Sequence, residues 1–302
     1  MEGLEATRLA RRRATVPGVR TPVGHAKETK REATSSLALQ KRRIDALTIE
    51  DERSFRHVGL YADLKEILRL DGYEVRVLPA SLEGRWDRAL FLNLTFWGAG
   101  EGGDILDGEQ IPADVVAHAA WHHLAARAFG GGAQSAEALF LGEAIASAFD
   151  VYLVGRLLGH APESSFLETQ VPAMAEAAQA AGLSDERFEA LLDEIAAAPE
   201  RAFEDLRALL VDATRALLAC TSADAALAAL APFDGHRFGP LLHRYELSNW
   251  VLYARAYGQA PATAVGADAR DVDAILRADG VVSIDWLETN WVVPALAKGG
   301  GG

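Results

Sequence analysis

Two histidines of this chain, His118 and His122, stand four positions apart in the segment Val115–Leu124. In an α-helix, residues i and i+4 lie on the same face, one turn apart. Both imidazoles would then reach a common point, which is how a single helix offers two nitrogen ligands to a zinc ion. Histidine is uncommon here, with eight in 302 residues, yet His123 makes three within six positions. Such a pair also occurs as packed or surface residues, so a further ligand is needed.

A candidate for that ligand, Glu143, stands in the segment Leu141–Asp150 among small and apolar residues. A carboxylate in such surroundings needs a partner, because its desolvation is costly. Glu143 and Asp150 are seven positions apart and share one face of a predicted helix. Asp150 would either orient a metal-binding histidine or form an ordinary salt bridge. The residues therefore predict a site with two nitrogen ligands and one oxygen ligand.

These residues resemble the metal-binding motifs of the gluzincin metallopeptidases, the thermolysin-like and aminopeptidase-like group. In that group one helix carries His-Glu-x-x-His, and a glutamate on a second, downstream helix is the third ligand. His118 and His122 match the two histidines, and Glu143 follows 21 positions later within Gly142-Glu143-Ala144. The resemblance covers about residues 73–158. It implies a zincin-like fold that binds Zn²⁺ through these three residues and acts on a peptide or protein.

Ala119 departs from the family pattern, because the family has its catalytic glutamate at that position. A zinc ion alone lowers the pKa of its bound water to ~7. Loss of a positioned general base typically costs ~10²–10⁴ in rate. The resemblance therefore implies a metallopeptidase-like protein, an uncertain enzyme, whose peptide hydrolysis is impaired or rewired. The chain would be a pseudoenzyme, an enzyme whose base comes from elsewhere, or an inactivated variant of an active parent.

Two alternatives stay open. The first is a non-catalytic binding or regulatory module on a zincin-like fold, in which any metal is structural. The second is a non-haem iron site, because two histidines and one carboxylate also form the facial triad of Fe(II) oxygenases. Those triads usually occupy β-barrels, which the helical pattern of this chain does not resemble.

Several other residues are candidates for supporting roles. Gluzincin-like sites often use a tyrosine or histidine of a downstream helix to stabilise the oxyanion, and the resemblance extends this role to Tyr245 or His243, with His236 as a third option. Acids of a Gly-rich loop could replace the missing base. That loop covers residues 98–108, and the acids around it are Glu101, Asp104 and Glu109.

Their neighbours on the first histidine helix have plainer predicted roles. His123 points about 100° away from His122 on a helix, so it is expected to be packed or exposed rather than a ligand. Trp121 is expected in the core, because large aromatic side chains contribute most when buried.

Strand-like runs are confined to the first half of the chain. Residues 73–78 alternate apolar and polar types, residues 89–97 are rich in aromatic and β-favouring types, and a short strand is expected near Ile105. Helical periodicity covers 54–70, 112–129, 135–158, 164–181, 185–197, 200–219, 237–257 and 268–278. The predicted fold class is therefore α+β and predominantly helical, with a small sheet at about 73–106 followed by a helical body.

Charge divides the chain into two parts. Residues 1–44 hold eleven Lys or Arg and four Glu, which leaves 19 basic and 39 acidic residues for the remainder. Residues 1–48 lack sustained apolar periodicity and contain proline and glycine breakers, so they are predicted to be a disordered basic leader outside the core. Residues 49–302 are predicted to be the zincin-like domain with a C-terminal helical part.

Composition excludes several classes of protein. An acidic body does not suit a nucleic-acid binder, which needs a clustered basic surface. Cys220 is the single cysteine, so no disulfide can form within the chain. No run reaches ~18 apolar residues, so no membrane span is expected. A cytoplasmic protein is the expectation that fits these features.

Overall fold

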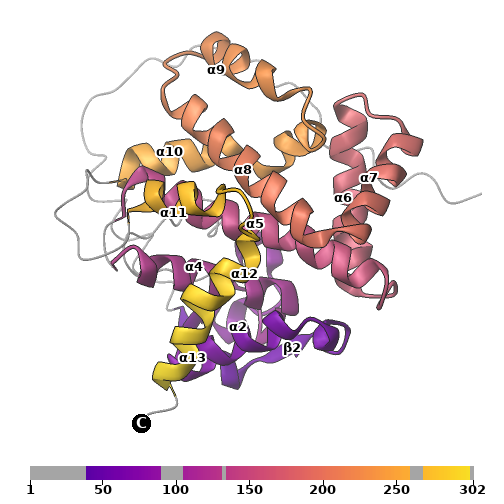
Figure 1. Cartoon of the computed structure of the whole chain (residues 1–302). Coiled ribbons are helices and arrows are strands. Elements are labelled where there is room, and N and C mark those ends of the chain that lie inside the picture. Colours follow the sequence, from indigo (N-terminus) through magenta and orange to yellow (C-terminus); the bar gives the residue numbers. More distant parts are fainter. Residues whose placement is uncertain (1–38, 90–104, 131–133, 259–267, 300–302) are drawn as a thin grey trace, which may run out of the picture. The chain divides into compact units, whose positions relative to one another are not determined.

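The computed structural model describes residues 39–89, 105–130, 134–258 and 268–299 (Figure 1). The fold is α+β and predominantly helical, as expected from the sequence. One mixed sheet has the strand order β1-β3-β4, with β1 (Gln40–Arg43) antiparallel and β4 (Ile105–Leu106) parallel to β3 (Glu74–Val77). A separate parallel pair joins β2 (Thr48–Glu50) to β5 (Gln110–Pro112).

Strands β1 and β2 correct the predicted boundary of the leader. The boundary at residue 48 is wrong for residues 39–48, because β1 pairs with β3 in register from Gln40 opposite Val77 to Arg43 opposite Glu74. Ile44, in the 3-10 turn η1 (Ile44–Ala46), is buried in the core. The strand β1 reads Gln-Lys-Arg-Arg, and backbone hydrogen bonds rather than apolar side chains hold it in place, so its sequence gives no strand signal. Residues 1–38 lie outside the described part.

The predicted strands have mixed outcomes. Strand β3 lies within the predicted 73–78, and β4 begins at the predicted Ile105. Ala89 does not begin a strand, because it is helical, in a turn that starts at Trp86 and follows the 3-10 turn η3 (Ala80–Leu82). Residues 90–97 of that prediction lie outside the described residues.

Five of the central helices match their predicted ranges to within one residue, and the first begins five residues later than expected. A 3-10 turn, η2 (Ser54–His57), precedes the first of them, where one continuous helix was expected. The helices are α2 (Gly59–Leu70), α4 (Ala113–Ala128), α5 (Ala136–Leu158), α6 (Ser165–Ala180), α7 (Asp185–Ala197) and α8 (Pro199–Leu218). Their starts agree because capping signals mark them: the Ser135 hydroxyl accepts a hydrogen bond from the backbone N–H of Ala138, and Ser184 caps α7 in the same way.

The C-terminal elements are more broken than predicted. The expected helix at 237–257 is interrupted at Glu246, whose φ of 48° separates η5 from α10. The remaining elements are α9 (Ala223–Leu230), η4 (Ala231–Phe233), η5 (Gly239–Tyr245), α10 (Leu247–Tyr257), α11 (Ala269–Leu276), α12 (Ser283–Leu287), the π-helical turn η6 (Glu288–Val292) and α13 (Val293–Gly299). Helices α9, α12 and α13 were not expected.

Helix α5 is the centre of the core and packs against α4, α7, α8 and α10. It is the one helix in the described part long and apolar enough to cross a membrane, but 83% of the relevant window is buried inside the fold. Trp121 of α4 is fully buried against Phe149 of α5, as expected. Gly142 lets the two helices approach closely, since a Cβ there would lie 3.3 Å from the Cβ of Ala125.

Candidate metal centre

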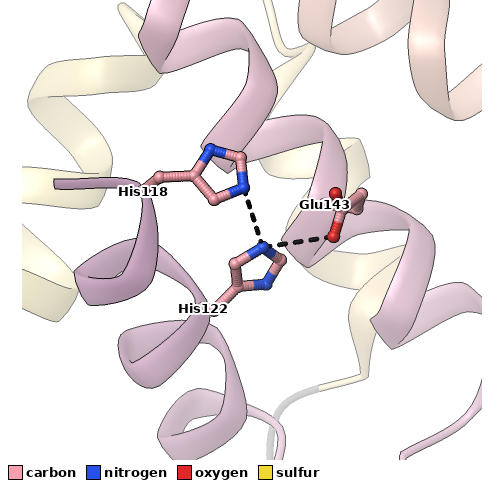
Figure 2. Close-up of side chains that lie close together, drawn as sticks. All are labelled: His118, His122 and Glu143. Atoms are coloured by element: carbon pink, nitrogen blue, oxygen red, sulfur yellow. Dashed lines mark hydrogen bonds and ion pairs between the residues drawn. The ribbon is translucent and has the colours of Figure 1, made fainter. Parts of the chain in front are cut away.

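Helices α4 and α5 bring His118, His122 and Glu143 to one place (Figure 2). The Nε2 atoms of His118 and His122 lie 3.2 Å apart. Nε2 of His122 lies 3.1 Å from Oε2 of Glu143. The potential ligand atoms of all three residues fall within 4.8 Å of one another. The spacing of the histidines on one helix and the helix pairing at Gly142 together produce this arrangement.

This triangle has nearly the size that a zinc ion requires. Ligand atoms about 2.0–2.1 Å from a tetrahedral zinc ion are separated by about 3.3 Å. The distances of 3.2 and 3.1 Å that meet at His122 are close to that value. The ligand atoms of His118 and Glu143, the third pair, lie within 4.8 Å of each other. The residues present therefore fit a divalent metal ion with nitrogen and oxygen ligands.

Asp150 of α5 supports the first histidine. Its Oδ2 lies 3.3 Å from Nδ1 of His118. A carboxylate at Nδ1 favours the tautomer that is protonated there, which leaves the lone pair of Nε2 facing His122 and Glu143. The same contact is a salt bridge when His118 is protonated, so each of the two roles considered from the sequence stays a prediction. Its Oδ1 is buried and has no hydrogen-bond partner among the described residues.

The charges at the site keep Glu143 ionised. Burial by itself would raise the pKa of Glu143, but the charges of His122 and His118 and the hydrogen bond from His122 outweigh it and lower that pKa to about 2. The side chains remain partly open to solvent, at 27% for His118, 40% for His122 and 31% for Glu143. The site is therefore reachable by a water molecule or a small ligand.

Asp114 is a neighbour that the sequence analysis missed. It lies on α4 one turn before His118. Burial, and then the charge of Asp150, raise the pKa of Asp114 to about 6. The signal in the sequence was its spacing, because Asp114, His118 and His122 follow one another at intervals of four and so lie along one stripe of the helix.

Ala119 and His123 lie on other faces of α4. Ala119 is 6% exposed and belongs to the hydrophobic core, so this position supplies no proton acceptor. His123 points away from the triad of His118, His122 and Glu143, as predicted. Its Nε2 lies 2.7 Å from Oδ2 of Asp71, which also pairs with Arg127.

The acids proposed as a substitute base do not supply one in the described part. Glu109 is exposed and accepts a hydrogen bond of 2.8 Å from Nε of Arg42. Glu101 and Asp104 lie outside the described residues.

The residues suggested for oxyanion stabilisation are divided by the fold. Tyr245 lies on η5, and burial raises the pKa of its hydroxyl. No contact with the three candidate ligands is seen for it among the described residues. His243, on the same element, is exposed. Nδ1 of His236 accepts a hydrogen bond from the backbone N–H of Phe238, and the His236 ring contacts the Phe238 ring.

A second missed neighbour is Tyr253 of α10. Burial raises its pKa, and the charges of Tyr257 and Glu143 raise it further. Tyr253 is thus within electrostatic reach of Glu143. No sequence signal predicted this, because it depends on how α10 packs against α5. Comparison of the chain with known protein families, with curated proteins and with solved structures finds no match.

Proposed function

We propose that this chain is a zinc-binding, metallopeptidase-like protein whose ion is held by His118, His122 and Glu143. The observation that carries the proposal is the convergence of the three side chains, with distances of 3.2 and 3.1 Å meeting at Nε2 of His122. Two imidazoles and one carboxylate form the protein ligand set of several catalytic zinc sites. The contact of Asp150 with His118 adds the support that ligand histidines usually have.

Three protein ligands leave a fourth zinc position for water or for a substrate carbonyl. In that position a substrate carbonyl would be polarised by the metal, and a water molecule would have its pKa lowered to ~7. The protein's own part is to hold the three ligands in place. All three side chains are partly exposed, so this position can be reached from solvent.

Hydrolysis is expected to be weak, because Ala119 cannot accept a proton. A missing general base corresponds to a loss of ~10²–10⁴ in rate. The proposed activity is therefore peptide hydrolysis that is impaired or depends on a base outside α4. Ala119 also supports the alternative, a module that binds a peptide at the metal without cleaving it.

The zinc-loaded protein should be incubated with a diverse peptide mixture and the products identified by mass spectrometry. The proposal expects slow cleavage that stops on chelation and is absent in His122→Ala. The exposed His160→Ala is the matched control, because it removes a histidine to which no role at the centre is assigned. Peptide binding without cleavage would favour the non-catalytic module, and cleavage that persists in His122→Ala would contradict a role for this centre.

A further inference from the structure

A cavity of about 350 Å³ lies between α8 and the turn that follows α11. Side chains of the first half of α8 line one side of it, and residues 276–281 line the other. Its charged lining residues are Arg201, Arg207, Arg277, Glu204, Asp205 and Asp279. The volume is at the lower end of the range for ligand pockets, which suits a molecule about as large as a single amino acid. None of the lining residues belongs to the metal centre.

Arg207 supplies a buried charge to this cavity. Its side chain is only 1% exposed, and its Nη1 donates a hydrogen bond of 2.7 Å to Oδ1 of Asp273. Its Nε is also buried, and it has no hydrogen-bond partner among the described residues. A buried donor that lacks an acceptor destabilises the fold. An acceptor that enters the cavity can therefore gain a hydrogen bond from Arg207 that the described part of the chain does not satisfy.

The unsatisfied nitrogen belongs to the edge of the guanidinium group that suits a carboxylate. Nε and Nη2 point to the same side of this planar group, and together they can hold both oxygens of a carboxylate through two parallel hydrogen bonds. The bond to Asp273 starts from Nη1 and does not use this edge. Arg207 can therefore hold Asp273 and a carboxylate in the cavity at the same time.

The other two arginines of the lining already have carboxylate partners. Arg277 pairs with Asp212 and with Asp273, each at 2.9 Å. Arg201 pairs with Asp205 at 3.0 Å, and its side chain is largely exposed. We therefore expect the main hydrogen bonds to a bound carboxylate to come from Arg207.

Two acids of the lining favour a positive charge on the same ligand. Glu204 is half-buried, and its Oε1 accepts a hydrogen bond of 2.9 Å from the backbone N–H of Ser283, which fixes the position of this carboxylate. Asp279 is exposed, so it lies at the mouth of the cavity. These carboxylates repel a simple anion, and the arginines repel a simple cation. A ligand that carries both charges avoids both penalties.

We propose that this cavity binds a free α-amino acid, with its carboxylate on the Nε–Nη2 edge of Arg207 and its ammonium group facing Glu204 and Asp279. Leu276 and Val281 also line the cavity and offer apolar contacts to an aliphatic side chain. The site goes beyond the proposed function and does not depend on it, because neither its residues nor its ligand involve the metal.

Three small molecules test the two ends of the ligand separately. L-Alanine carries both charges, N-acetyl-L-alanine keeps only the carboxylate, and L-alaninamide keeps only the ammonium group. Calorimetric titration of the full chain should show saturable binding of one L-alanine per chain. Each of the other two compounds should bind about 10-fold more weakly, because each lacks one of the two charged hydrogen-bonding groups.

Two variants assign the ends of the ligand to residues. Asp279→Asn should weaken the binding of L-alanine by about 10-fold and leave that of N-acetyl-L-alanine unchanged, because the latter has no ammonium group. Arg207→Lys keeps the buried charge but removes the two-nitrogen edge, so it should weaken the binding of both carboxylates and not that of L-alaninamide. Asp279 is exposed, so its variant remains a test even if Arg207→Lys is unstable.

Asp271→Asn is the matched control, because Asp271 is an exposed acid of α11 outside the lining; it should bind L-alanine like the parent protein. A folded parent protein without saturable binding of L-alanine at millimolar concentrations would overturn the proposal. So would L-alanine that binds no more tightly than N-acetyl-L-alanine or L-alaninamide, or an unchanged affinity in Asp279→Asn. None of these results bears on zinc binding, so the cavity and the metal centre are tested independently.

Discussion

Oδ2 of Asp150 lies 3.3 Å from Nδ1 of His118, although Asp150 comes two helical turns after Glu143 on the same helix. One face of α5 thus provides both a candidate metal ligand and the carboxylate that orients another. The finding predicts that Asp150→Ala lowers zinc affinity by ~10–100-fold, the usual effect of removing such a partner. Asp150→Asn should lower it less, because its amide oxygen still accepts from Nδ1–H. Competition with a chromophoric chelator measures both, and Asp193→Asn, an exposed acid on α7, is the control.

Substitution of Gly142 is predicted to change the zinc affinity as well. A leucine there would push α5 away from α4, since even a Cβ lies 3.3 Å from that of Ala125. Glu143, the next residue, would then move away from His122. We expect Gly142→Leu to cost about 1–3 kcal/mol in the free energy of unfolding and to weaken zinc binding.

Gly142→Ala is the control for this effect. It should be nearly neutral, because its methyl group needs a shift of only a few tenths of an ångström and alanine favours the helix. Urea unfolding and chelator competition give the two quantities. Unchanged zinc affinity in Gly142→Leu would mean that the helix spacing does not set the site.

The sequence predicted best what depends on local patterns. The limits of α4 and α5 followed from apolar periodicity and from the Ser135 cap, and the spacing of His118 and His122 predicted that both imidazoles share a face. Glu143 was placed beside them through its apolar surroundings and a motif resemblance. The helix contact that brings it there depends on Gly142, whose role is visible only when the two helices are packed.

What the sequence missed depends on contacts between distant segments. Strand β1 carries charged residues and is ordered by its pairing with β3, which no local pattern reveals. The charge of Glu143 helps to raise the pKa of Tyr253 although 110 residues separate the two in the chain. Helix α9 buries none of its residues, and its sequence shows no apolar stripe from which a helix could be predicted.

Ala119 allows a direct test of the missing base. Ala119→Glu places a carboxylate 100° from His118 on α4. Because the position is only 6% exposed, the added side chain must extend towards His118, His122 and Glu143 for the fold to accept it. Zinc-dependent peptide hydrolysis should then rise by ~10²–10⁴. Ala119→Gln has the same shape without a base and should give no rise. Equal activity of the two variants on a diverse peptide pool, with zinc bound to both, would count against a peptidase architecture.

Acid sensitivity should come from the buried ion network between α8 and α11. Oδ1 and Oδ2 of Asp273 each lie 2.7 Å from a guanidinium nitrogen, of Arg207 and Arg215 respectively. Burial would raise the pKa of Asp273, but hydrogen bonds from Arg277, Arg207 and Arg215 lower it below its usual range. A carboxyl whose pKa is lower in the folded state stabilises the protein above its unfolded pKa of ~3.9, and this contribution is lost as pH falls through the folded value.

Asp273→Asn should therefore destabilise the protein at pH 7 by about 3–5 kcal/mol, because it leaves buried arginine charge unpaired. The difference from the parent protein should shrink as pH falls below about 4. Urea unfolding across this range measures it, and Asp87→Asn, at the exposed Arg85 pair, should have little effect at any pH. A difference that does not change with pH would show that the charge of Asp273 is not what stabilises α11 on α8.

Elemental analysis of the purified full chain, dialysed against a trace of zinc, tests the metal centre most directly. We expect about one zinc ion per chain in the parent protein, as a single site of this ligand set implies. Loss of that ion is expected in His118→Ala, His122→Ala and Glu143→Ala, while the surface variant His160→Ala keeps it. A parent protein without zinc, or zinc retained in all three triad variants with the fold intact, would contradict the account.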